Sequence, residues 1–134
     1  MATVTTQIIP RYSDLDLNFV IHPVKKDINI LTSEMAVINS IKNLILTNHY
    51  ERPFQPQIGS NVRGMLFENM DNITATTIEN EIRQTIANFE PRASVSKIFV
   101  VADYENNGFK VTLNFFVINR TTPITINFFL ERLR

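Results

Sequence analysis

The amino-acid sequence predicts an α+β protein, a single domain with about three helices packed on one face of a mainly antiparallel sheet. Segments with helical periodicity occupy the first two thirds of the 134-residue chain. The last third alternates apolar and polar residues at the period of two that half-buried strands show. Because a C-terminal β-meander follows the helices, the helices should form a separate layer over the sheet. We expect an extended N-terminal arm at residues 1–11 and one domain at residues 12–134.

The first helix is expected to follow a short strand. Residues 27–31 alternate at period two and predict that strand, after a polar segment at residues 12–17. Thr32 or Ser33 is suited to cap a helix that continues to about Thr47. The apolar face of this helix comprises Val37, Ile38, Ile41, Leu44 and Ile45.

A loop and two further helices are expected next. Two prolines and a glycine exclude regular helix between residues 49 and 59 and predict an ordered loop. A short helix should follow Ser60, and a third helix is predicted over residues 75–89 with Thr74 as its cap. Pro91 ends it. The apolar stripe of the third helix comprises Ile78, Ile82, Ile86 and Phe89.

Three strands complete the expected fold. The first strand is predicted at residues 97–104, which are rich in β-branched and aromatic residues. The other two are predicted at residues 109–117 and 124–130, which alternate apolar and polar residues at period two. The sequence Asn106-Asn107-Gly108 is a turn signal, because asparagine and glycine tolerate a positive φ. Residues 121–123 predict the second turn. The three segments therefore predict antiparallel neighbours.

The composition excludes several classes of function. Thirteen Lys and Arg balance thirteen Asp and Glu, so the basic excess typical of proteins that coat nucleic acid or membranes is missing. The chain has no cysteine and two histidines, which excludes thiolate chemistry and disfavours a metal site. Neither a signal-peptide pattern nor an apolar run of ~18 residues is present. We expect an intracellular soluble protein without cofactor, nucleic-acid or membrane partner.

Candidate catalytic side chains are few. His22 and His49 lie in no nucleophile motif, and structural roles are favoured for both. A glycosidase needs two acids roughly 5 to 9.5 Å apart, and the candidates are Glu68, Asp71 and Glu90. Since there is no tryptophan for sugar stacking, solvated or ion-paired acids are the favoured interpretation. The three glycines form no phosphate-binding motif.

Glu90 and Arg92 flank Pro91 at the predicted end of the third helix. A carboxylate is disfavoured at a helix C-terminus by roughly 0.3–1 kcal/mol. One interpretation is a local surface ion pair worth ~0–1 kcal/mol. The other is a docking point at which each charge meets a partner. The spacing alone favours the local pair.

Three motifs occur in order along the chain. They are Arg52-Pro53-Phe54-Gln55-Pro56-Gln57-Ile58-Gly59, Leu66-Phe67-Glu68 and Glu90-Pro91-Arg92. Together with the segment at residues 12–16, they resemble the phage baseplate wedge family that initiates the contractile tail sheath. Members of this family are sometimes described as lysozyme-like, and relatives occur in type VI secretion baseplates. The resemblance covers residues 12–118 in order and spacing.

This resemblance implies a structural subunit of the inner baseplate that docks wedge proteins and initiates sheath assembly by strand addition to its sheet. It implicates Glu90, Pro91 and Arg92 in partner binding, and Arg52, Pro53, Phe54 and Gly59 in shaping the supporting loop. The expected partners are wedge proteins and the sheath protein, with the tail tube as a further candidate. No catalytic residue, metal, cofactor or small-molecule ligand is implied. The expected location is the virion baseplate, after assembly in the host cytoplasm.

Two other classes of function stay open at this point. One is a peptidoglycan-cleaving, lysozyme-like glycosidase carried in the baseplate, which incubation with peptidoglycan would reveal. The other is a free-standing peptide-binding module, which would have no sheath or tail-tube genes beside its own. The long alternating strands favour an assembly subunit, because exposed strand edges can be used by partners.

Overall fold

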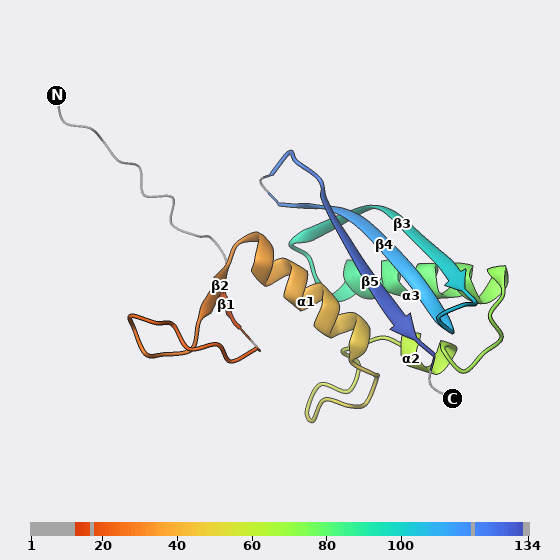
Figure 1. The fold of residues 1–134 in the computed structure, drawn as a ribbon, viewed down its shortest axis with the longest axis horizontal. Helices are drawn as coiled ribbons and strands as arrows, with labels where there is room; N and C mark the ends of the chain where they lie inside the picture. Colours follow the sequence, from red (N-terminus) through yellow and green to blue (C-terminus); the bar gives the residue numbers. More distant parts are fainter. Residues whose placement is uncertain (1–12, 17, 119, 133–134) are drawn as a thin grey trace. The chain divides into compact units, whose positions relative to one another are not determined.

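The computed structural model describes residues 13–16, 18–118 and 120–132 (Figure 1). The arm expected at residues 1–11 lies outside the described residues. The chain divides into two compact units, one ending at Ala36 and the other beginning at Val37, and these are described separately. The expectation of one domain over residues 12–134 stays a prediction.

The first unit contains a small antiparallel hairpin. Strand β1 (Ser13–Leu15) pairs with β2 (Ile30–Thr32), and an isolated bridge joins Ile21 to Ile28. The strand predicted at residues 27–31 is therefore shorter and begins three residues later, at Ile30. Strand β1 lies in the segment at residues 12–17, for which only a polar segment was expected. Strands of three residues contain too few side chains for a period of two to mark their bounds.

Three helices follow. Helix α1 (Glu34–Leu46) has nearly the predicted bounds, although Ser33 adopts a φ of 53° instead of the extended backbone of a typical N-cap. Helix α2 (Val62–Met65) is the expected short helix. Helix α3 (Asn72–Phe89) begins three residues before the prediction, and Thr74 is not its cap. The carboxylate of Asp71 accepts the Thr74 N–H at 2.7 Å instead, so Asp71 is the N-cap.

The three predicted strands form one antiparallel sheet in the second unit. Strands β3 (Ala93–Asp103), β4 (Gly108–Val117) and β5 (Ile124–Glu131) lie in that order, as Figure 1 shows. The Asn107 φ of 52° fits the predicted turn between β3 and β4. The pairing of β3 with β4 shifts register between Val95 and Lys97, whereas the pairing of β4 with β5 is regular.

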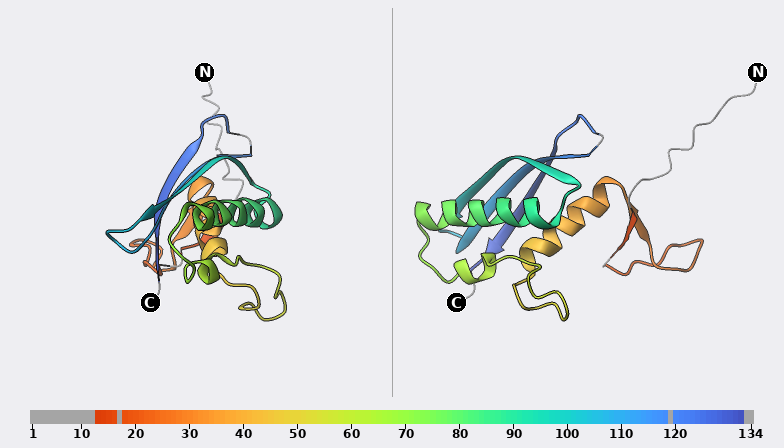
Figure 2. Two further views of the ribbon diagram at one scale, coloured as in Figure 1. Left: turned by 90° about the vertical axis from the view of Figure 1, so that its right-hand side faces the viewer. Right: turned by 180° about the vertical axis from the view of Figure 1, so that it is seen from behind.

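The core of the second unit lies between the helices and one face of this sheet. Figure 2 shows α3 running along that face. The buried residues that meet there include Val37, Ile41 and Ile45 of α1, Ile78, Ile82 and Ile86 of α3, and Phe109, Val111, Leu113 and Phe115 of β4. Fully burying each such side chain contributes roughly 1.5–3 kcal/mol. The predicted α+β class and the apolar face of α1 are confirmed. In α3 the predicted stripe is buried at Ile78, Ile82 and Ile86, whereas Phe89 at the end of the helix is only half-buried and lies outside this core.

Candidate functional site

Glu90 and Arg92 form a bidentate ion pair across Pro91. Arg92 Nε donates to Glu90 Oε1 at 2.6 Å, and a terminal guanidinium nitrogen donates to Oε2 at 2.7 Å. The backbone fixes both residues, since the Glu90 N–H donates to the carbonyl of Ile86 and the Ile118 N–H donates to that of Arg92. The pair therefore lies where α3 ends and β3 begins.

The Glu90 carboxylate is buried, with 2% of the side chain exposed, whereas Arg92 is 25% exposed. Burial raises the pKa of Glu90, but hydrogen bonds from Arg92 and Ser40 and the charge of Arg92 together lower the pKa below its ordinary value. Ser40 belongs to α1, so the carboxylate links α1 to the segment that joins α3 to β3. Glu90 and Arg92 form a local ion pair, as their spacing in the sequence predicts, but the pair is far more buried than a surface ion pair.

The loop from His49 to Gly59 is held at its base by two hydrogen bonds that Ser60 donates to the end of α1 and the residue after it. The Ser60 N–H donates to the Thr47 carbonyl at 2.8 Å, and Ser60 Oγ donates to the carbonyl of Ile45 at 2.7 Å. Gly59 is buried and has a φ of 138°, a conformation that side-chain-bearing residues rarely adopt. Gly59 thus has the geometry of a loop-shaping residue.

The side chains at the other end of this loop face solvent. Arg52, Pro53 and Phe54 are all exposed, and Phe54 is as accessible as in an extended chain, at 101%. Tyr50 is 85% exposed. Both aromatic residues have a positive φ, 67° at Tyr50 and 69° at Phe54. The loop-shaping roles of Arg52, Pro53 and Phe54 stay predictions, because all three residues are exposed.

Two of the three candidate acids, Asp71 and Glu90, lie too far apart to act as a glycosidase pair, and the third, Glu68, is exposed. Asp71 and Glu90 flank the 18-residue helix α3 at its two ends, roughly 28 Å apart at 1.5 Å per residue. The Thr74 N–H lowers the pKa of Asp71, which opposes a role as general acid. His22 Nδ1 accepts the N–H groups of Val24 and Lys25 within a turn. Among the described residues no group of three or more His, Cys, Asp or Glu could hold a metal.

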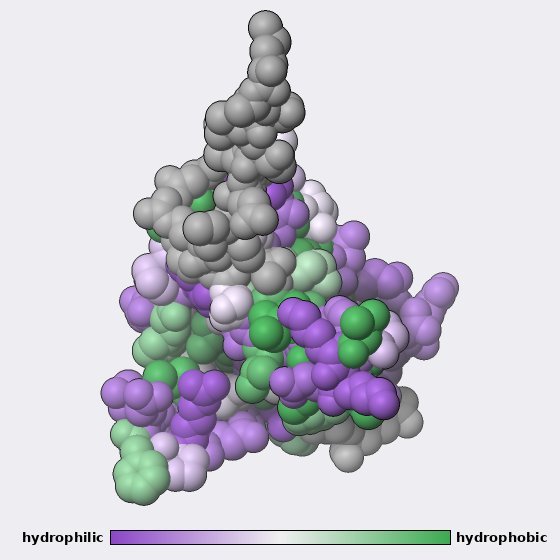
Figure 3. Space-filling view, turned by 90° about the vertical axis from the view of Figure 1, so that its left-hand side faces the viewer, coloured by the Kyte–Doolittle hydropathy of each residue, from purple (hydrophilic) through white to green (hydrophobic). Residues whose placement is uncertain are grey.

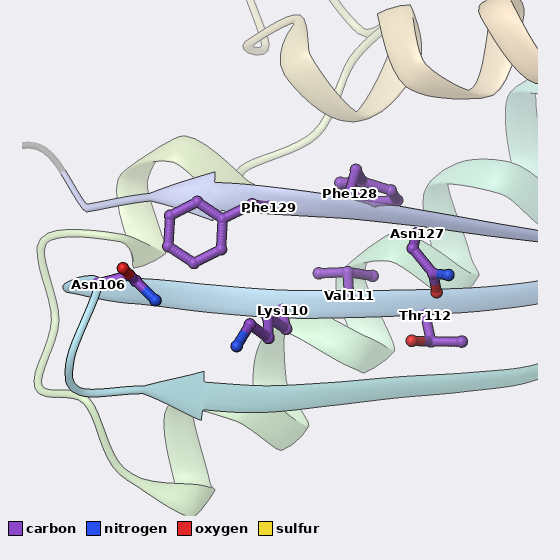
Figure 4. A pocket seen from close by; sticks show the side chains of 7 residues that line it. All are labelled: Asn106, Lys110, Val111, Thr112, Asn127, Phe128 and Phe129. Carbon is purple, nitrogen blue, oxygen red and sulfur yellow. The ribbon is translucent and has the colours of Figure 1, made fainter.

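The face of the sheet opposite α3 carries a shallow hollow of about 680 Å³. Figure 4 shows Lys110, Asn127 and Phe129 standing on this face of β4 and β5. Lys110 also forms an ion pair with Asp103. Of the residues that line the hollow only Lys110 ionises, so the hollow lacks the pair of groups that acid–base catalysis uses.

Strand β5 has a neighbouring strand on one side only among the described strands. The Arg132 N–H donates to the Asn107 carbonyl at 3.0 Å. Arg132 and Asn107 are the next opposed residues after Glu131 and Gly108 in the β4–β5 register, and they form a hydrogen-bonded pair. Such pairs alternate with non-bonded pairs along an antiparallel ladder. The N–H groups of Thr125, Asn127 and Phe129 therefore point toward the open edge.

Several contributors to these sites could not be identified from the sequence. Ser40 lies outside the apolar stripe of its helix, and its contact with Glu90 depends on how α1 packs against the end of α3. Tyr50 adopts a positive φ, which aromatic residues seldom do, and no local pattern in the sequence marks it. The turn signal Asn106-Asn107-Gly108 correctly predicts a left-handed residue, although of the three only Asn107 has a positive φ.

The fold is that of small α+β proteins from contractile-tail baseplates. A crystal structure from Geobacter sulfurreducens described as a tail lysozyme matches with a TM-score of 0.67 and 22% identity, over 77% of this chain and 96% of that one. A chain of the anti-feeding prophage baseplate matches with a TM-score of 0.63 and 17% identity, over 92% and 87%. A chain of the postcontracted pyocin R2 baseplate matches with a TM-score of 0.55 and 18% identity, over 88% and 98%.

The sequence itself identifies the family. Residues 32–120 match the model of the baseplate wedge protein gp25 family. The baseplate wedge protein gp25 of Enterobacteria phage T4 is 32% identical over 113 residues, which cover 84% of this chain and 85% of that protein. The chain belongs to the baseplate wedge protein gp25 family, and is a structural component of the virion tail baseplate. None of the helices that the structure describes could cross a membrane.

Proposed function

We propose that this subunit docks wedge proteins at Glu90-Pro91-Arg92 and initiates sheath assembly by strand addition at β5. The observation that carries the proposal is the regular, open edge of β5, with the N–H groups of Thr125, Asn127 and Phe129 directed outward. An extended segment of the sheath protein can pair with these groups, and pockets between alternate side chains can set its register.

The geometry favours β5 over β3 as the receiving edge. The register shift between Val95 and Lys97 interrupts β3, and irregularities of this kind blunt a strand edge against pairing. Strand β5 pairs without interruption over the eight positions that join Gly108–Phe115 to Ile124–Glu131. A sheath segment therefore has a longer regular template on β5.

Arg92 is the element of the docking motif that a partner can reach. The Glu90 carboxylate is buried and engaged by Arg92, so Glu90 positions the guanidinium rather than meeting a partner directly. Pro91 restricts the backbone between the two charges. The exposed quarter of the Arg92 side chain then presents a fixed cation to a carboxylate or a carbonyl of a wedge protein.

A non-catalytic role is supported by the separation of Asp71 from Glu90 and by the pairing of Glu90 with Arg92. The sheath and tail-tube proteins would be partners through assembly, and no small molecule is required. If the purified protein cleaved peptidoglycan and Glu68→Gln, Asp71→Asn or Glu90→Gln abolished the cleavage, the glycosidase alternative would replace this proposal.

Proline substitution on β5 tests sheath initiation. Thr125→Pro or Asn127→Pro removes an outward N–H while sparing the hydrogen bonds to β4. Phage particles carrying either variant should contain assembled baseplates without sheath. The matched variants Thr125→Ala and Asn127→Ala keep the N–H groups and should produce sheathed tails. Sheathed tails from both proline variants, with the protein folded and incorporated, would overturn strand addition at β5.

A further inference from the structure

We infer that the loop tip, residues 50–54, is a separate docking surface. In this proposal Phe54 inserts into an apolar pocket of a partner protein, and Arg52 pairs with a carboxylate at the rim of that pocket. The proposal relies on family membership, but not on the docking role of Arg92 or on strand addition at β5. It assigns to Phe54 a role in binding instead of a role in supporting the loop.

The loop tip exposes two aromatic side chains that do not pack against the rest of the protein. Phe54 is 101% exposed and Tyr50 is 85% exposed, so neither ring contributes to the core. Figures 1 and 2 show the loop extending away from the helices and the sheet of its unit. In the space-filling view of Figure 3 this loop forms the projection at the lower left, which ends in apolar surface. An aromatic side chain in such a position is available to a partner.

The backbone of the loop tip is strained and fixed. Tyr50 and Phe54 have φ values of 67° and 69°, a region that disfavours bulky residues. The strain persists because the Tyr50 N–H donates to the Pro56 carbonyl at 2.8 Å and the Glu51 carboxylate accepts the Asn48 N–H at 2.8 Å. Strain of this kind clusters at binding sites. A preorganised loop also loses less conformational entropy when it binds.

The chemistry of the loop tip selects the kind of partner. Arg52 is exposed and makes no ion pair within the part of the chain that the structure describes, whereas Glu51 is engaged by the backbone of Asn48. Arginine and aromatic residues dominate the binding energy of protein interfaces. Two aromatic rings and one cation are too few for stable attachment to a lipid surface. An apolar pocket with an acidic rim on a protein is the complementary surface.

Two variants of Phe54 separate binding from folding. Phe54→Ala should weaken incorporation into purified wedge complexes roughly 10- to 100-fold in apparent Kd, as expected for an interface hot spot. Phe54→Gly should weaken incorporation equally while keeping or raising the Tm, because glycine relieves the positive φ. Arg52→Glu should also weaken incorporation, through repulsion from the acidic rim. The control is Ile73→Ala, which removes an apolar side chain that is 77% exposed on α3 and should bind normally.

The outcomes are distinguishable. Normal incorporation of folded Phe54→Ala and Phe54→Gly proteins would overturn the proposal. Cosedimentation of the wild-type protein, but not of Phe54→Ala, with vesicles of equal phosphatidylcholine and phosphatidylglycerol would instead assign the loop tip to a lipid surface. An Asn127→Pro protein should incorporate normally even if it starts no sheath, so failure of strand addition leaves this test unaffected.

Discussion

Gly59 and Thr47 approach so closely that a Cβ atom on Gly59 would stand 2.6 Å from the Thr47 carbonyl oxygen. The same carbonyl accepts the Ser60 N–H at 2.8 Å, so it cannot move away without losing that hydrogen bond. The φ of 138° at Gly59 independently disfavours a side chain. The end of α1 and the end of the loop are therefore joined at a point that requires glycine.

Gly59→Ala should lower the free energy of unfolding by at least about 1–3 kcal/mol, because alanine is strained at this φ and clashes with backbone atoms. Chemical denaturation of both proteins measures the difference. Gly64→Ala is the matched control, since its Cβ would meet only the end of the Asn61 side chain, which can rotate. That control should be neutral or more stable by up to about 1 kcal/mol. Equal stability of Gly59→Ala and the wild type would contradict the geometry.

Glu90→Gln should destabilise the protein by about 2–3 kcal/mol at neutral pH, because it removes one charge of a largely buried pair. The folded-state pKa of Glu90 lies below its ordinary value of 4.5. The unfolded chain therefore binds the proton more tightly, and the contribution of the carboxylate is complete above about pH 4.5 and is lost as the pH falls through the folded-state pKa. The free energies of unfolding of the wild type and Glu90→Gln, measured between pH 7 and pH 3, should approach each other as the pH falls. A constant difference across this range would contradict the prediction.

Asp103 should titrate at a pKa of about 2 in the folded protein, because hydrogen bonds from Lys110 and Asn106 stabilise its carboxylate. Its ordinary value is 3.8, so the stabilisation is present above that pH and is lost as the pH falls toward about 2. The carboxyl chemical shift in an NMR titration reports this pKa directly. Lys110→Met should raise it toward 3.8, whereas Lys42→Met, a change on the exposed face of α1, should leave it unaltered.

The sequence specifies the layers of this fold better than its junctions. The stripe Ile78, Ile82 and Ile86 and the alternation from Phe109 to Val117 repeat over many residues, so periodicity identifies them with the correct inward face. Residue type alone does not place the cap of α3, because Asp71 and Thr74 are both good capping residues and only the direction of the Thr74 N–H distinguishes them. A local signal with two acceptable solutions does not fix a boundary.

The sequence predicts only part of the candidate site, because some of its features depend on how distant segments pack. The Glu90-Pro91-Arg92 spacing reveals that two charges meet at a corner, but the burial of Glu90 and its contact with Ser40 depend on long-range packing of α1. Likewise, the prolines predict an ordered loop, but no local rule predicts a left-handed Phe54. The hydrogen bonds that hold the loop tip lie within the loop itself, from the Tyr50 N–H to the Pro56 carbonyl and from the Asn48 N–H to the Glu51 carboxylate, and no turn motif in the sequence predicts them.

The burial of Glu90 determines how the docking role of Arg92 must be tested. Arg92→Ala alone leaves a buried carboxylate without its bidentate partner, so a failure to join the baseplate could reflect misfolding. The double variant Glu90→Gln/Arg92→Met removes both charges and avoids this penalty. We expect it to stay folded by circular dichroism but to bind wedge proteins roughly 10-fold or more weakly, because the fixed cation is gone.

Glu90→Gln is the matched control for that experiment, because it keeps the arginine and loses only its acidic partner. If Arg92 contacts the wedge, this single variant should bind more tightly than the double variant once both are compared below their melting temperatures. Isothermal titration with purified wedge complex gives both affinities. Equal, wild-type affinity for the two variants would mean that Glu90 and Arg92 only join α3 to β3. In that case the docking surface would have to lie elsewhere, and the loop tip at Phe54 would be the next position to test.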